Sequence, residues 1–98
     1  MLEIIQSETF KRWQAGLKDR QAIARVNARI RRLSEGNPGD AKLVRGGVCE
    51  LRIDCGPGYR VYFVRRGPLV IVLLAGGDKR TQDADIDRAI EIANDWKE

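Results

Sequence analysis

Residues 50–82 constrain the fold most, because they form three consecutive strand-like runs, ELRIDCGPGYRVYFVRRGPLVIVLLAGGDKRTQ. In the first run, apolar residues at 49, 51 and 53 alternate with charged residues at 50, 52 and 54, which is the period of a strand with one apolar face. Gly56-Pro57-Gly58 and Gly67-Pro68 predict turns between the runs. The third run, residues 69–74, is apolar on both faces and indicates a central, covered strand.

Two helices are predicted before this region and one after it. Ser7 and Asp19 are the expected N-caps of the first two, with Glu8 placed to complement the dipole of the first. The apolar stripe of the second helix recurs at helical spacing and consists of Ile23, Val26, Ile30 and Leu33. The turn formers of residues 36–40 end that helix, which predicts a helical hairpin. The last helix is expected to begin at Thr81 or Asp83 and to bury Ile86, Ala89, Ile90, Ala93 and Trp96.

With a short strand at residues 2–6, the predicted order is β-α-α-β-β-β-α. We therefore expect an α+β protein whose mostly antiparallel, twisted sheet is packed by an N-terminal helical hairpin and a C-terminal helix. At 98 residues, the chain is expected to form a single domain, 1–98, with one modest core.

Composition limits the location and the chemistry of the protein. The longest apolar run, residues 69–75, is far shorter than the roughly 20 residues that cross a bilayer, and the N-terminus lacks a signal-like apolar core. A cytoplasmic protein is expected. Cys49 and Cys55 would lie about 20 Å apart along an extended strand, so no disulfide is expected between them. With no histidine in the sequence, no metal site and no cofactor are expected either.

Charge is distributed unevenly along the chain. Residues 83–98 contain six acidic and two basic side chains, a net charge of −4. Because the whole chain has a net charge of +4, residues 1–82 have a net charge of +8. A basic body with an acidic last helix suggests one face for a polyanion and another face turned away from it. The alternative is a solvated surface that happens to be rich in arginine and lysine.

The predicted hairpin places basic side chains on the face opposite Leu51 and Ile53. In an even register, Arg52, Arg60 and Tyr62 share that face. Like charges across neighbouring strands repel, and guanidinium groups offer planar forks of donors to phosphate oxygens, so a phosphate would relieve the cluster. In the alternative interpretation, Glu50 and Asp54 neutralise these arginines and nothing else binds.

Two further groups of residues are candidates for contacts to a polyanion. Residues 76–82 join the central strand to the last helix, where free N–H groups would attract an anion together with Lys79 and Arg80. The glycine and lysine spacing differs from that of a nucleotide P-loop. Tyr59 and Tyr62 flank Arg60, and one of them could stack on a base; core packing or a hydroxyl hydrogen bond is the alternative for each.

The absence of histidine removes the usual general base of ribonucleases. Any RNA cleavage would have to depend on stabilisation of the phosphorane by arginine and lysine, with the 2′-hydroxyl positioned in line. Such a site would be poor on free RNA and would need a substrate whose geometry is supplied by something else.

Four motifs resemble the RelE/ParE toxin superfamily, and within it the HigB-like addiction module killer proteins: GNPGD, GVCELRI, GPGYRVYF and LLAGGDKRTQ. The resemblance covers the whole chain in the same element order. It implies the toxin of a type II toxin–antitoxin system. RelE-like members are ribosome-dependent, metal-independent mRNA endoribonucleases that inhibit translation and leave a 2′,3′-cyclic phosphate and a 5′-hydroxyl. ParE-like members inhibit DNA gyrase without nuclease activity, which is the alternative function.

The resemblance also implies site residues and partners. It assigns Arg60 to the scissile phosphate, Arg52 to a base or charge-stabilising position, and Lys79 and Arg80 to stabilisation of the transition state. The sequence departs from the family at two positions: Ile86 stands where a catalytic tyrosine or histidine is often found, and Glu50 where a second lysine is often found. The implied partners are mRNA on the ribosome and a HigA-like helix-turn-helix antitoxin, of which an acidic segment is expected to cover the arginine face.

Overall fold

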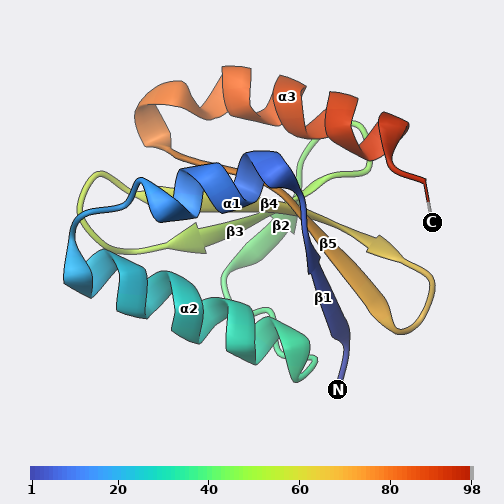
Figure 1. Cartoon of the computed structure of the whole chain (residues 1–98), viewed down its shortest axis with the longest axis horizontal. Coiled ribbons are helices and arrows are strands. Elements are labelled where there is room, and N and C mark those ends of the chain that lie inside the picture. The colour runs from blue at the N-terminus through green and yellow to red at the C-terminus, as the bar shows by residue number, and fades with distance from the viewer. Residues whose placement is uncertain (98) are drawn as a thin grey trace.

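A five-stranded sheet with helices on both faces forms the protein (Figure 1). The computed structural model describes residues 1–97. In chain order the elements are β1 (Glu3–Gln6), α1 (Glu8–Ala15), α2 (Arg20–Ser34), β2 (Ala41–Leu43), β3 (Cys49–Ile53), β4 (Tyr59–Arg66), β5 (Val70–Asp78), a short 3-10 turn η1 (Lys79–Thr81) and α3 (Gln82–Asp95).

The sheet has the order β1-β5-β4-β3-β2. Only β1 and β5 run parallel within the described chain, and the other three pairs are antiparallel. The predicted α+β class and mostly antiparallel sheet are thus confirmed. β5 lies between β1 and β4 with residues 71–75 buried, as its continuous apolar run predicts.

The strand expected from residue 42 onward is divided in two. Gly46 and Gly47 take positive φ angles of 68° and 77°, which side chains with a Cβ rarely adopt, and they turn the chain between β2 and β3. β2 has only three residues, so its alternation is too short to be recognised as a separate strand from sequence.

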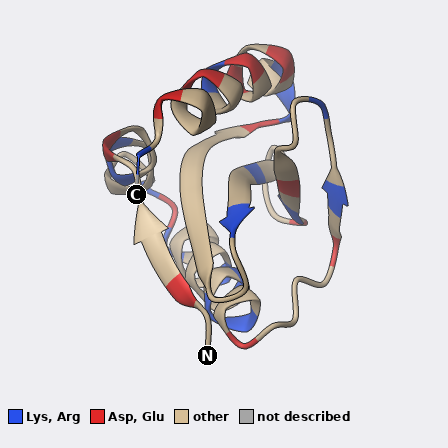
Figure 2. Cartoon of the chain, turned by 90° about the vertical axis from the view of Figure 1, so that its right-hand side faces the viewer, with Lys and Arg blue, Asp and Glu red and all other residues tan. Residues whose placement is uncertain are grey.

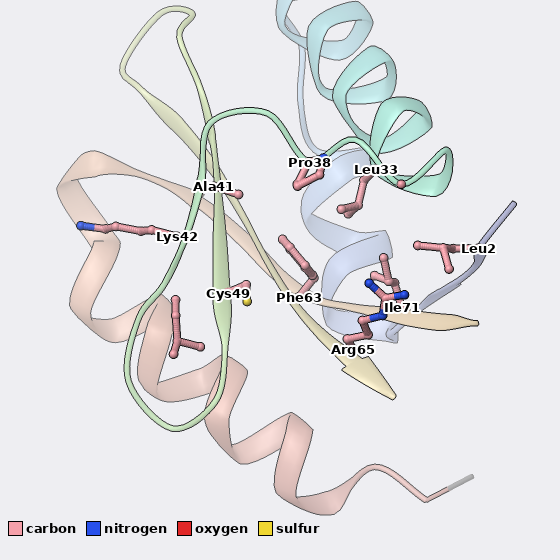
Figure 3. Close-up of a pocket in the computed structure, with 11 residues that line it drawn as sticks. Leu2, Leu33, Pro38, Ala41, Lys42, Cys49, Phe63, Arg65 and Ile71 are labelled. Carbon is pink, nitrogen blue, oxygen red and sulfur yellow. The ribbon is translucent and has the colours of Figure 1, made fainter. Parts of the chain in front are cut away.

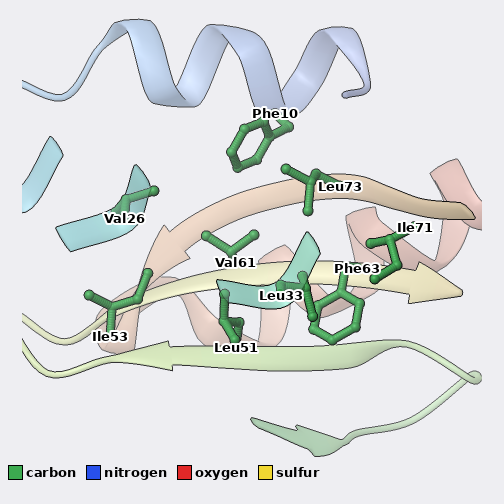
Figure 4. Close-up of a cluster of buried hydrophobic side chains, with 9 residues drawn as sticks. All are labelled: Phe10, Val26, Leu33, Leu51, Ile53, Val61, Phe63, Ile71 and Leu73. Atoms are coloured by element: carbon green, nitrogen blue, oxygen red, sulfur yellow. The ribbon is translucent and has the colours of Figure 1, made fainter. Parts of the chain in front are cut away.

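Two apolar clusters lie on opposite faces of the sheet. The cluster beneath α1 and α2 contains Phe10, Val26 and Leu33 from the helices, packed on Leu51, Ile53, Val61, Phe63, Ile71 and Leu73 from the strands (Figure 4). The second cluster joins Ile86, Ala89 and Ala93 of α3 to Val48, Tyr62, Val72, Leu74 and Ala75. A β-bulge at Leu74 places this residue and Ala75 in the same cluster, beneath α3.

The predicted caps of the first two helices are confirmed. Ser7 Oγ accepts a hydrogen bond of 3.0 Å from the Phe10 N–H and donates one of 2.6 Å to the Leu74 carbonyl, which attaches the start of α1 to β5. Asp19 Oδ1 accepts a bond of 2.9 Å from the Gln21 N–H at the start of α2. Thr81 is the N-cap of α3, but its hydroxyl donates to Asp85 Oδ2 at 2.5 Å instead of capping a backbone N–H.

The glycine-rich segment expected to be a loop before the last helix is part of β5. Gly76 pairs with Val61 and Gly77 with Arg60, and neither glycine has a positive φ angle. Their small size is needed for close packing, because a Cβ at Gly76 would lie 2.1 Å from Trp13 Cε3 and one at Gly77 would lie 1.8 Å from Asp85 Oδ2. The glycines let α1 and α3 approach the two faces of the sheet and do not form an anion-binding loop.

We predict that Gly76→Ala lowers the free energy of unfolding by about 2 kcal/mol, because the half-buried Trp13 ring must move to admit the new methyl group. Urea denaturation measures the change. Gly16→Ala is the matched control, since its Cβ would meet only backbone oxygens at 3.5 Å and its φ of −82° suits alanine. Equal stabilities of the two variants would contradict the close packing at Gly76.

Candidate anion-binding site

Arg52 and Arg60 lie directly opposite each other on β3 and β4, in the predicted register. Both belong to the sheet face on which α3 packs. They line a pocket of about 240 Å³ together with Asp40, Ile53, Asp54 and Gly58, which we call the arginine pocket. The arrangement brings two guanidinium groups to one concave surface, which is the chemistry that recognises an oxyanion.

A buried carboxylate lies behind the arginine pocket. Glu50 is fully buried, and its Oε1 lies 3.2 Å from Arg60 Nη1 and 3.4 Å from Arg52 Nε. Its Oε2 accepts hydrogen bonds from the Tyr62 hydroxyl at 3.2 Å and from Gln82 Nε2 at 2.6 Å. We call these five residues the Glu50 network.

The burial of Glu50 changes the interpretation of the charged face of β3, which is only partly open to solvent. Sequence alternation gives Glu50 the same face as Arg52 correctly, but α3 covers the part of that face that contains Glu50. Glu50 contacts both arginines, as the alternative interpretation expects of it. Asp54 contributes differently: its side chain is exposed, and its backbone carbonyl accepts a hydrogen bond from Arg25 Nη1 at 3.1 Å.

Tyr62 is a structural member of the network. Its side chain is fully buried, so it presents no face for a base to stack on, which corrects the role in substrate binding considered from sequence. Burial raises the pKa of Tyr62 far above its usual range, and the adjacent Glu50 carboxylate raises it further. The phenol therefore remains protonated and donates to Glu50.

Tyr59 faces the other side of the sheet. It is half-buried against the cluster beneath α1 and α2, and its ring meets Trp13 edge-on at a centroid distance of 6.2 Å. The Tyr59 ring therefore packs on the core, which is one of the alternatives to base stacking given in the sequence analysis. Base stacking on Tyr59 at the arginine pocket does not fit this arrangement.

Lys79 and Arg80 follow β5 in the turn η1, and they differ in their charge environment. Arg80 Nη2 lies 2.9 Å from Asp78 Oδ2, and Asp78 Oδ1 accepts from the Arg80 backbone N–H at 2.8 Å. The Arg80 side-chain hydrogen bond holds the pKa of Asp78 below its usual value, so the carboxylate stays charged and neutralises Arg80. Lys79 is exposed, and its Cβ lies 3.6 Å from where a Cβ of Gly58 would be, which places it beside the arginine pocket.

Each of the two arginines is partly buried and partly exposed. The Nε atoms of Arg52 and Arg60 are buried and make no hydrogen bond within the described residues, although Arg52 Nε lies 3.4 Å from Glu50 Oε1. The side chain of Arg60 is 13% exposed and that of Arg52 is 38% exposed, so both can be reached from solvent. The exposed parts of the two guanidinium groups, and not their buried Nε atoms, are therefore the donors that an anion in the pocket would meet.

The sequence did not assign a catalytic or substrate-binding role to four individual polar residues near the arginines. Asp40 and Asp54 are the acids that line the arginine pocket, whereas Gln82 donates to Glu50 from the first turn of α3. Asp85 lies against Gly77, the strand partner of Arg60, and burial raises its pKa. Asp40 belongs to the turn that follows α2, so only the folded chain brings it to the pocket.

The described residues contain no group of three or more metal-ligating side chains, and no helix long and apolar enough to span a membrane. Cys49 and Cys55 are free thiols, and burial raises the pKa of Cys49.

A second pocket, of about 300 Å³, lies at the end of the apolar cluster beneath α1 and α2, between β2 and the C-terminal end of α2 (Figure 3). Leu2, Leu33, Phe63 and Ile71 contribute to its apolar lining. Its charged lining residues are Lys42 and Arg65, and none of the residues singled out from sequence as substrate-binding or catalytic is among them. We therefore place the candidate chemistry at the arginine pocket.

Acidic residues are concentrated along α3, where Figure 2 colours them red. Arg45, in the turn between β2 and β3, lies 2.6 Å from Asp87 and 3.8 Å from Asp83, so part of this acidic surface is paired within the chain. Both pairs are largely exposed and contribute little to stability.

We predict that Glu50→Ala lowers the free energy of unfolding by about 3 kcal/mol, because it leaves Arg60, Tyr62 and Gln82 without their shared acceptor. Urea denaturation monitored by tryptophan fluorescence measures this loss. Glu91→Ala, at an exposed position of α3, is the control and should change stability by less than about 0.5 kcal/mol. A Glu50→Ala protein as stable as that control would refute the network's structural role.

We also predict a pH dependence for Asp85. Because its pKa is higher in the folded than in the unfolded state, the free energy of unfolding falls as pH rises from the unfolded pKa through the folded pKa. Asp85→Asn should lack this loss of stability. Its free energy of unfolding relative to that of the wild type should therefore be higher at pH 7 than at pH 3. Urea titrations between about pH 3 and pH 7 test this, with exposed Asp95→Asn keeping the wild-type slope.

Comparison with known proteins provides one close relative. No family model matches the chain. An uncharacterized protein of Haemophilus influenzae is 48% identical to it over 94 residues, which cover 96% of this chain and 95% of that protein. Identity at this level over almost the full length of both chains indicates common descent. The chain belongs to the same protein family as this Haemophilus influenzae protein.

Proposed function

We propose that the protein is the toxin of a type II toxin–antitoxin system, a HigB-like member of the RelE/ParE superfamily that cleaves mRNA on the ribosome. The observation that carries the proposal is the arginine pair Arg52 and Arg60, side by side across two strands and both partly exposed in one pocket. The four motifs quoted from the sequence support the proposal, as does the order of helices and strands apart from the additional strand β2.

The proposed reaction is a metal-independent transesterification. The 2′-hydroxyl oxygen attacks the adjacent phosphorus while the bond from phosphorus to the 5′-oxygen breaks, which gives a 2′,3′-cyclic phosphate and a 5′-hydroxyl. Arg52 and Arg60 donate to the phosphate oxygens, on which negative charge increases in the transition state. Lys79, beside Gly58, adds positive charge at the edge of the pocket. Arg80 contributes less, because Asp78 neutralises it.

Proton transfer in this reaction falls to carboxylates or to water. The acids lining the arginine pocket are Asp40 and Asp54, and either can accept the 2′-hydroxyl proton, while water protonates the leaving 5′-oxygen. Glu50 is unsuited to this role, because it is fully buried and both of its oxygens are engaged. A weak base of this kind requires a substrate held in line, which the ribosome would supply.

A second candidate function is inhibition of DNA gyrase without RNA cleavage. The observation that favours it is the neutralisation of half of the arginine charge by Glu50, together with the absence of histidine from the sequence. In either case the proposed partner is a HigA-like helix-turn-helix antitoxin whose acidic segment covers the arginine pocket.

We predict that Arg60→Ala and Arg52→Ala each reduce ribosome-dependent mRNA cleavage by at least about 100-fold, because each removes a donor to the phosphate oxygens. Primer extension on a reporter mRNA, with and without ribosomes, measures the cuts. Arg88→Ala, on α3 at an exposed position, is the matched charge control and should cleave like the wild type.

Circular dichroism of each variant separates loss of chemistry from loss of fold, which matters most for the nearly buried Arg60. Cleavage that persists in both arginine variants would refute the proposed nuclease site. Intact mRNA from a wild-type protein that still arrests growth would support the gyrase alternative, which a supercoiling assay then tests.

A further inference from the structure

We propose that Glu50 determines the substrate specificity of the arginine pocket: it lowers the pocket's charge so that internal phosphodiesters bind and terminal phosphates are rejected. The inference rests on the proposed function, since it concerns the same phosphate site. It starts from the contacts of Glu50 Oε1, which lies within 3.4 Å of nitrogen atoms of both arginines.

Arg52, Arg60 and Glu50 together carry one net positive charge, and Lys79, Asp40 and Asp54 at the edge of the pocket bring the sum to zero. A phosphodiester inside an RNA chain carries one negative charge. A terminal phosphate carries roughly 1.5 to 2 negative charges at pH 7. Two unopposed arginines would suit such a dianion, but the buried carboxylate removes one of their charges.

The rim of the pocket adds to this discrimination. Asp40 and Asp54 line it and are both exposed, so their carboxylates repel the additional charge of a terminal phosphate. Their interaction with a ligand is screened by salt, whereas that of the fully buried Glu50 is screened much less. Glu50 is therefore expected to account for most of the preference.

Glu50 acts as a positioning residue and not as a catalytic one. It engages Arg60 through Nη1 and approaches Arg52 at Nε, which leaves other guanidinium N–H groups of the two side chains directed elsewhere. Tyr62 and Gln82 hold the second carboxylate oxygen, so the carboxylate itself has little freedom to turn. The orientation of the two arginines is thus fixed from β3, β4 and α3 at once.

The test compares two probes that differ by one methyl group: 2′-deoxyuridine 3′-phosphate and its methyl ester, neither of which can be cleaved. Titrations of the whole chain followed by NMR at pH 7.5 give both dissociation constants. The wild type should bind the methyl ester about tenfold more tightly than the terminal phosphate. Equal binding, or tighter binding of the terminal phosphate, would overturn the inference while leaving the proposed phosphate site intact.

Glu50→Gln tests the residue itself, because the amide retains the size of the side chain and can still accept from Arg60. The variant should bind the terminal phosphate at least tenfold more tightly than the wild type does, with less than a threefold change for the methyl ester. An unchanged preference would overturn the role of Glu50. Exposed Glu91→Gln is the matched control for the lost charge and should behave like the wild type.

If Glu50→Gln does not fold, two further measurements test whether the pocket selects its ligand by charge. Asp54→Asn, at the rim, should shift the preference in the same direction by about threefold, and no shift would count against charge selection. At pH 5 the terminal phosphate loses most of its second charge, so the wild-type preference should disappear. The methyl ester reports any protonation of Asp40, Asp54 or Asp85 beside the pocket, because its own charge is constant. Failure of the wild type to bind either probe would refute the proposed function itself.

Discussion

The burial of the Glu50 carboxylate is the constraint on which the site depends. Removing a charged carboxylate from water costs several kcal/mol unless charges and hydrogen bonds replace its solvation. Here the replacement comes from three elements: β3 supplies Arg52, β4 supplies Arg60 and Tyr62, and α3 supplies Gln82. The same contacts that solvate Glu50 therefore attach the start of α3 to the sheet and fix the two arginines of the pocket.

A buried ion pair is weak grounds for a purely stabilising role, because an apolar cluster of similar volume often stabilises a protein as well or better. The surrounding face illustrates this, since Val72, Leu74 and Ala75 pack under α3 as an apolar cluster. The Glu50 network lies at the end of that face where the arginines are partly exposed and the pocket opens. Its position suggests that the charge serves the pocket and not the core.

Much of the fold was predictable from local sequence patterns. The period of two in β3 and β4, the caps Ser7 and Asp19, and the shared sheet face of Arg52 and Arg60 follow from residues close together in the chain. The errors arose where a distant element decides the outcome. Alternation assigns Glu50 to a face, but the helix that buries this face begins some 30 residues later. Gly76 and Gly77 indicate a turn from composition alone, whereas the ring of Trp13 and the carboxylate of Asp85 explain why glycine is required.

In the candidate site, too, the features set by local sequence were predictable and those set by distant elements were not. The two arginines were recognised because they share a hairpin, whereas Asp40, Gln82 and Asp85 reach the site only through tertiary packing. The tyrosines were placed correctly on their strands, yet one is covered by α3 and the other packs on Trp13. A site assembled in this way holds an anion with donors from the sheet and surrounds it with carboxylates from elsewhere. Its selectivity therefore depends on tertiary packing, which brings buried and rim carboxylates to a pair of arginines that the hairpin alone would leave open to any anion.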